Sequence, residues 1–106
     1  MATGLDFIEY VCGQIKSAGI VTYRKMFGEY MVYVNAKPLL LVCDDTVYVK
    51  TLDCLGDLMA HAQTGLPYEG AKPHYILDID DNNLSLEVIR VLEPLTPLPK
   101  SRLKKA

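Results

Sequence analysis

The feature that most constrains the fold is the run from Val21 to Lys50, where β-branched and aromatic residues are interrupted by two short polar turns. Asn35-Ala36 and Asp44-Asp45 form these turns, and Asn and Asp tolerate the positive φ that a tight hairpin needs. Ala36 stands where glycine is usual, so the first turn departs from the preferred pattern. The run predicts strands joined as hairpins, over Val21–Met26, Tyr30–Val34, Pro38–Cys43 and Thr46–Lys50.

Two-residue turns also determine which residues face each other across the strands. The second turn places Val42 opposite Val47, and the first places Met31 opposite Leu40. One face of the predicted sheet then carries Met31, Tyr33, Leu40, Val42, Val47 and Val49. The other face carries Tyr30, Val32, Leu39, Leu41, Cys43, Tyr48 and Lys50. A sheet with one solvated face should alternate apolar and polar residues, but this sheet is apolar on both faces. We therefore expect the second face to be covered, by helices of the same chain or by a second subunit.

Helical periodicity in three further segments completes the predicted fold. The helices are expected at about Asp6–Ser17, Leu52–Gln63 and Leu84–Glu93, with a fifth strand at His74–Ile79 before the last of them. Thr3 or Asp6 is a candidate cap for the first helix, and Asp80–Asn83 offers a cap for the last. Gly56 lies inside the second helix, where glycine costs about 1 kcal/mol relative to alanine. The order α-β-β-β-β-α-β-α predicts an α+β fold with a single antiparallel sheet of about five strands and about three flanking helices.

The charge distribution separates a predicted domain, residues 1–99, from a mobile basic tail, residues 100–106. The tail contains no acid and four basic residues, Lys100, Arg102, Lys104 and Lys105. Without these four, the chain has 7 basic and 13 acidic side chains, a formal charge of about −6. An acidic body repels a phosphate backbone, so direct nucleic-acid binding is expected only weakly, through the tail.

The first residues and the cysteines indicate a cytoplasmic protein without a metal or cofactor. Met1–Asp6 lacks the basic and apolar parts of a secretory signal, and no apolar run approaches the roughly 20 residues of a membrane span. The three cysteines lack CxxC spacing and are expected to be buried free thiols, Cys12, Cys43 and Cys54. A zinc site needs about four ligands, and only His61 and His74 could add to them, so no metal site is expected.

Four segments in order resemble the TfoX/Sxy family, in the stand-alone form of its N-terminal domain. They are Arg24-Lys-Met-Phe-Gly28, the hairpin with Tyr33, Tyr48-Val-Lys50, and Leu66-Pro-Tyr-Glu-Gly-Ala-Lys72. The resemblance covers about Phe7 to Leu92. It implies a two-layer α+β fold similar to secretion chaperones. The founding members of that family are bacterial competence regulators that promote transcription without being enzymes, so the resemblance implies a regulatory role.

Seven residues are candidates for binding: Arg24, Lys25, Tyr30, Tyr48, Lys50, Tyr68 and Glu69. The two cations before the Met-Phe-Gly corner could hold a carboxylate or phosphate, or fasten the corner by an ion pair to Glu29 or Glu69. The three sheet residues could line a ligand pocket or stack bases, or they could pack at a helix or subunit contact. The two loop residues could border a pocket or close the edge of the core.

No catalytic set is present, since the chain has no Gly-rich phosphate loop, no nucleophile elbow and no local His-Cys pair. We therefore expect a non-enzymatic domain that binds an unknown protein partner and forms a homodimer through the second sheet face. The alternative is a small-molecule-binding protein or an enzyme that uses Arg24, Tyr48, Lys50 and Tyr68. A pocket beside these four residues would favour the alternative, and a flat surface would favour partner binding.

Overall fold

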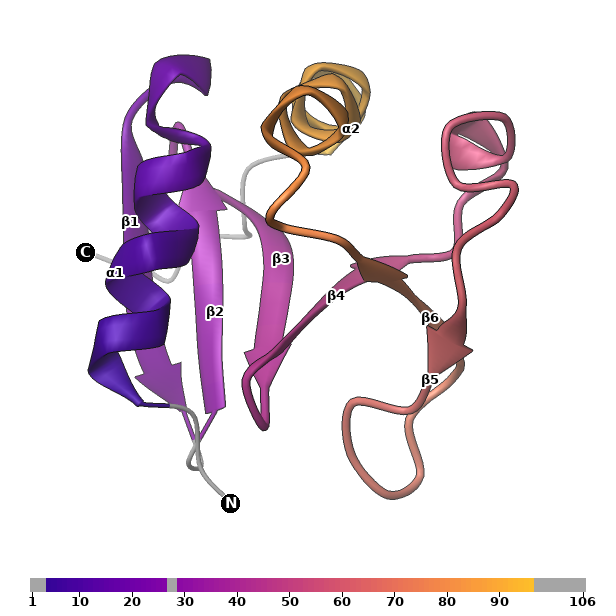
Figure 1. Ribbon diagram of the computed structural model, residues 1–106, viewed down its shortest axis with the longest axis horizontal. Coiled ribbons are helices and arrows are strands. Elements are labelled where there is room, and N and C mark those ends of the chain that lie inside the picture. Colours follow the sequence, from indigo (N-terminus) through magenta and orange to yellow (C-terminus); the bar gives the residue numbers. More distant parts are fainter. Residues whose placement is uncertain (1–3, 27–28, 97–106) are drawn as a thin grey trace, which may run out of the picture.

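The computed structural model describes residues 4–26 and 29–96, as an α+β fold with one sheet and two α-helices (Figure 1). The helices are α1 (Leu5–Gln14) and α2 (Asn82–Leu95), and the short 3-10 helices are η1 (Lys16–Ala18) and η2 (Asp53–Leu55). The strands are β1 (Val21–Met26), β2 (Glu29–Val34), β3 (Lys37–Cys43), β4 (Thr46–Lys50), β5 (Thr64–Gly65) and β6 (His74–Leu77). They form one antiparallel sheet in the order β1-β2-β3-β4-β6-β5. The predicted α+β class with a single antiparallel sheet is confirmed, whereas the basic tail lies outside the described residues.

Both helices pack on the same face of the sheet. Figure 1 shows α1 lying along β1 and β2, while α2 contacts β3. The two helices share a single core with the sheet, to which α1 contributes Ile8 and Val11 and α2 contributes Val88 and Ile89. The other face of the sheet therefore carries neither helix. No helix in the described part of the chain is long and apolar enough to cross a membrane.

Both hairpin turns form where the sequence predicts them. Asn35 and Ala36 have φ of 53° and 69°, and Asp44 and Asp45 have φ of 54° and 56°. The flanking residues pair directly, which is the geometry of two-residue hairpin loops with positive φ at both positions. The Asn35 side chain also accepts a hydrogen bond from the backbone N–H of Ile20, at 3.0 Å. Ala36 thus adopts a left-handed conformation without being glycine, which is a cost that the rest of the hairpin must offset.

The predicted register between β2 and β3 is wrong beyond the turn. Met31 pairs with Leu41, not with Leu40, because the register shifts beside Val32 and leaves Leu39 as an extra residue in β3. Such a β-bulge lets one strand carry two residues opposite one of its partner. It reverses the predicted faces of β2. Tyr30 and Val32 point toward the helices with Leu40 and Val42, while Met31 and Tyr33 point to the other side with Leu41 and Tyr48.

The predicted second helix, Leu52–Gln63, is also wrong. This segment forms η2 and then a series of turns, followed by the two-residue strand β5, which the sequence pattern did not predict. Leu55 and Met59 are buried four residues apart, and the Leu55 carbonyl accepts from the Met59 N–H at 2.8 Å, so one helical turn remains. Leu52, at the start of the predicted helix, is 39% exposed, so the apolar spacing does not bury one continuous helical face.

The two α-helices differ from their predicted bounds at the ends. Asp81 caps α2, since its carboxylate accepts a hydrogen bond from the Leu84 N–H at 3.0 Å, as the sequence predicts for this turn. This helix runs through Pro94 and ends at Leu95. In α1, Asp6 lies in the first turn and does not cap the helix, and Thr3 lies outside the described residues. The helix ends at Gln14, and the predicted last turn is η1 instead.

Candidate functional site

One row of paired residues runs across the face of the sheet that the helices leave uncovered, which we call the open face. The row is Arg24 (β1), Met31 (β2), Leu41 (β3), Tyr48 (β4) and Ile76 (β6). Residues directly opposite each other in an antiparallel pair point to the same side of the sheet. The other four members of the row are apolar or aromatic, and the cation lies at the β1 end. The open face therefore presents a continuous apolar stripe across four strands, β2, β3, β4 and β6.

The two faces of the sheet differ in exposure as well as in neighbours. Val32, Val42, Val47 and Val49 on the helix side are at most 2% exposed. The apolar members of the row on the open face are all half-buried, and so is Tyr33 beside them. The helix side is thus a protein core, whereas the open face is a partly accessible apolar surface.

The two ends of the open face differ in charge. At the far end of β4, Lys50 pairs with His74, whose ring meets the Tyr48 ring edge-on with centroids 6.4 Å apart. The end beside the β3–β4 turn is acidic, because Glu29 is the first residue of β2 and Asp44-Asp45 form the turn itself. The open face is therefore apolar along its centre and acidic at the turn end.

Cys43 lies at this acidic end and is only 4% exposed. Burial, together with the charge of Glu29 and a hydrogen bond to its carboxylate, raises the pKa of the Cys43 thiol to about 12. The thiol stays protonated at neutral pH and donates to the carboxylate, so it is not a ready nucleophile. The prediction of three buried cysteines is wrong for Cys54, which is exposed, while Cys12 is half-buried.

The structure brings three of the seven predicted binding residues onto the open face: Arg24, Tyr48 and Lys50. Arg24 and Tyr48 are three strands apart, which corresponds to about 14 Å at the usual spacing between strands. Among the described residues, Arg24 makes no ion pair with Glu29 or Glu69, which was one of the two alternatives for its role.

The other four predicted residues lie elsewhere. Lys25 pairs with Tyr30 on the helix side of the sheet, where Tyr30 is 7% exposed and meets Tyr23 edge-on at 5.6 Å. Tyr68 and Glu69 are exposed in the loop between β5 and β6, which projects from the sheet in Figure 1. Tyr68 therefore does not close the core. The seven residues do not converge on one site.

Met31 and Ile76 belong to the open face but were not predicted as site residues. The predicted register lacked the bulge at Leu39 and therefore placed Met31 on the wrong face of the sheet. Ile76 joins the row only because β6 pairs with β4, a contact between distant segments that local sequence patterns do not encode. The signal that was available is the run of consecutive apolar or aromatic residues in both strands, which places such side chains on both faces of the sheet.

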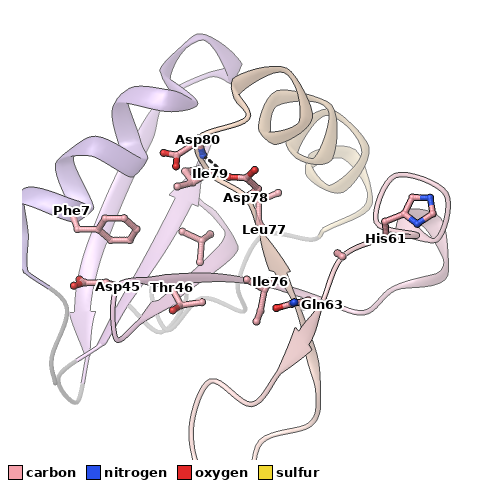
Figure 2. A pocket seen from close by; sticks show the side chains of 12 residues that line it. Phe7, Asp45, Thr46, His61, Gln63, Ile76, Leu77, Asp78, Ile79 and Asp80 are labelled. Carbon is pink, nitrogen blue, oxygen red and sulfur yellow. Dashed lines mark hydrogen bonds between the residues drawn. The ribbon is translucent and has the colours of Figure 1, made fainter.

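A cavity of about 520 Å³ opens on another part of the molecule (Figure 2). Phe7 of α1 points into it from one side and His61 lies on the other, with Asp45, Thr46 and the end of β6 between them. None of the seven predicted binding residues lines this cavity. It therefore does not provide the pocket that would favour the small-molecule alternative.

The acidic residues at this cavity have structural partners. Asp80 accepts a hydrogen bond from the Tyr10 hydroxyl, and this bond, with partial burial and the nearby carboxylates, raises the pKa of Tyr10. Asp78 accepts from the backbone N–H of Asp80 at 3.2 Å, and Gln14 donates to the carbonyl of Ile79 at 2.8 Å. The bonds made by Tyr10 and Gln14 tie α1 to the segment before α2. The described residues contain no group of three or more His, Cys, Asp or Glu arranged to hold a metal.

Comparison with known proteins finds one curated relative across nearly the whole chain. The uncharacterized 12.7 kDa protein in the trpE 5' region of Spirochaeta aurantia is 30% identical over 104 residues, which are 96% of this chain and 90% of that protein. No family model matches the chain.

Proposed function

Because this chain belongs to the same family as the 12.7 kDa Spirochaeta aurantia protein, whose name states no activity, we propose a function from its own surface. The chain is a non-enzymatic domain that binds a protein partner through the open face of the sheet. The observation that carries this proposal is the paired row from Arg24 to Ile76, an apolar stripe with one cation at its end, which neither helix covers. Across five strands it spans about 19 Å, the scale of a protein interface.

The composition of the open face supports a protein partner over a small ligand. Interfaces are enriched in Tyr, Met and Arg and depleted of other charged residues at their centre, and the open face presents Met31, Tyr33, Tyr48 and Arg24. The protonated thiol of Cys43 offers no nucleophile there. The resemblance to TfoX/Sxy regulators points the proposal toward a partner in gene regulation.

The first partner we propose is a second copy of the chain. Monomers rarely expose apolar patches of more than a few hundred Å², and closed two-fold pairs are the commonest oligomers. A two-fold contact between two open faces would bury the apolar stripe on both subunits. The proposed function thus includes a homodimer.

Sedimentation equilibrium at micromolar concentration tests this proposal. We expect a mass of about twice the 11.8 kDa of one chain. Leu41→Lys places a charge in the middle of the open face and should return the mass to one chain, with the circular dichroism spectrum unchanged. Leu5→Lys is the matched control, since Leu5 is 48% exposed on α1, away from the open face. A mass of 11.8 kDa for the natural chain, or no effect of Leu41→Lys, would refute the homodimer.

A further inference from the structure

The sheet ends at β1, and this edge strand has one side without a neighbouring strand (Figure 1). The order β1-β2-β3-β4-β6-β5 leaves two edges, of which β5 has only two residues and β1 has six. Residues 22–25, in the middle of β1, are all exposed. β1 is therefore the longer edge of the sheet, and its central side chains are accessible.

The backbone groups on the free side of β1 follow from its pairing with β2. The Asn35 N–H donates to the Ile20 carbonyl at 2.8 Å, and the antiparallel pairing continues from there along β1. In such a pair, residues bonded to the neighbouring strand alternate with residues whose N–H and C=O point away from it. The residues of β1 whose backbone groups point outward are Val21, Tyr23 and Lys25. A row of unpaired groups of this kind can accept an extended segment as a further strand.

The side chains of this edge are cationic, although the body of the molecule is acidic. Arg24 and Lys25 are the only adjacent cations in residues 4–26 and 29–96, and neither makes an ion pair within these ranges. β1 contains no acidic residue, whereas the chain without its four tail cations has 7 basic and 13 acidic side chains. Arg24 points to the open face and Lys25 to the helix side. An added strand with acids opposite both cations would therefore be attracted on both faces of the sheet.

The same two cations disfavour the β1 strand of a second copy as the occupant. Pairing two β1 strands would bring two copies of Arg24 and Lys25 close together, and like charges opposite each other destabilise a sheet. Cations on an edge strand protect many proteins from self-association in this way. An occupant of this edge must therefore come from another protein and carry the opposite charge.

We propose that β1 binds an extended acidic segment of another protein, which adds to the sheet as an antiparallel strand beside residues 21–25. Tyr23 is 41% exposed on the same face as Lys25 and favours an apolar residue opposite it. From its N-terminal side the segment therefore reads as two acidic residues, opposite Lys25 and Arg24, followed by an apolar one. This site goes beyond the open face of the proposed function and does not require the homodimer.

The synthetic peptide acetyl-Thr-Glu-Glu-Val-Thr-Val-amide tests the docking on the full natural chain. We expect saturable binding in an NMR titration, with slower amide hydrogen exchange at Val21, Tyr23 and Lys25 in the complex. The Thr22 and Arg24 amides bond to β2 and should exchange slowly with or without the peptide. Equal slowing of the two sets, or no saturable binding at millimolar peptide, would overturn the added strand.

Single N-methyl groups on the peptide provide a matched pair of probes. A methyl on the first Glu, opposite Lys25, replaces an N–H that faces β1 and should weaken binding about tenfold. The same methyl on the second Glu, opposite Arg24, points away from β1 and should leave the affinity unchanged. Equal effects of the two methyl groups would show that the peptide does not bind as a strand on this edge.

Charge reversal tests the choice of an acidic segment. Arg24→Glu combined with Lys25→Glu should abolish binding of this peptide and permit binding of a peptide with Lys-Lys in place of Glu-Glu. An unchanged preference for the acidic peptide would refute the proposal.

Leu41→Lys separates this site from the proposed homodimer. Leu41 lies on the open face two strands from β1, so the variant should bind the acidic peptide as the natural chain does, whatever its mass in sedimentation. Loss of binding would place the peptide on the open face and overturn the edge site. Failure of the edge site thus leaves the homodimer standing, and failure of the homodimer leaves the edge site standing.

Discussion

At the scale of single residues, the Cys43 thiol makes the stability of the fold depend on pH. Burial first, and the Glu29 carboxylate second, raise the pKa of this thiol from its ordinary 9.0 to about 12 in the folded chain. The unfolded chain therefore loses this proton at a lower pH than the folded chain does. The contribution of Cys43 to stability is complete below pH 9 and is lost as the pH rises toward 12.

This linkage predicts that the free energy of unfolding falls as the pH rises above 9. Cys43→Ser should show a shallower fall, because a serine hydroxyl can still donate to Glu29 but does not ionise in this range. Urea unfolding midpoints of the two chains, compared at neutral pH and above pH 9, measure the difference. Cys54→Ser is the control, since Cys54 is exposed. Parallel pH profiles for the natural chain and Cys43→Ser would contradict the assignment.

At the scale of elements, the β2–β3 hairpin is closed by an unfavourable turn residue. Ala36 has a φ of 69°, and a left-handed conformation costs a non-glycine residue about 1–2 kcal/mol. Ala36→Gly removes this strain but adds about 0.4–1 kcal/mol of chain entropy to the unfolded state. We expect a net gain of about 0.5–1 kcal/mol in the free energy of unfolding, measured in urea. Ala36→Val should lose stability instead, and a loss with glycine would show that the turn is not strained.

The same hairpin shows which parts of the fold could be predicted from sequence. The strands and both turns depend on neighbouring residues, so their patterns are visible in the chain. The bulge at Leu39 is not visible, because it depends on how Leu39 and Leu40 both fit into the core formed with the helices. The missing second helix has a similar cause: the spacing of Leu55 and Met59 fits a helix, but it also fits a single turn before β5.

At the scale of the whole molecule, the candidate site could be predicted only in part. Arg24, Tyr48 and Lys50 were found because they belong to strands whose bounds the sequence indicates. Tyr30 was placed on the wrong face because of the bulge. Ile76 was missed because the pairing of β6 with β4 joins segments that are far apart in the chain. Residues that depend on long-range pairing need the fold before they can be assigned.

The net charge of the whole molecule predicts how the chain behaves toward nucleic acid. The chain without its four tail cations carries about −6, so the folded body should repel DNA. Any binding at low salt should come from the tail, and with at most four phosphate contacts it should weaken about a hundredfold between 50 and 200 mM salt. Gel-shift titrations should show no binding once the four cations are replaced by Gln. Nanomolar binding by that variant would mean that the body carries a nucleic-acid surface despite its charge.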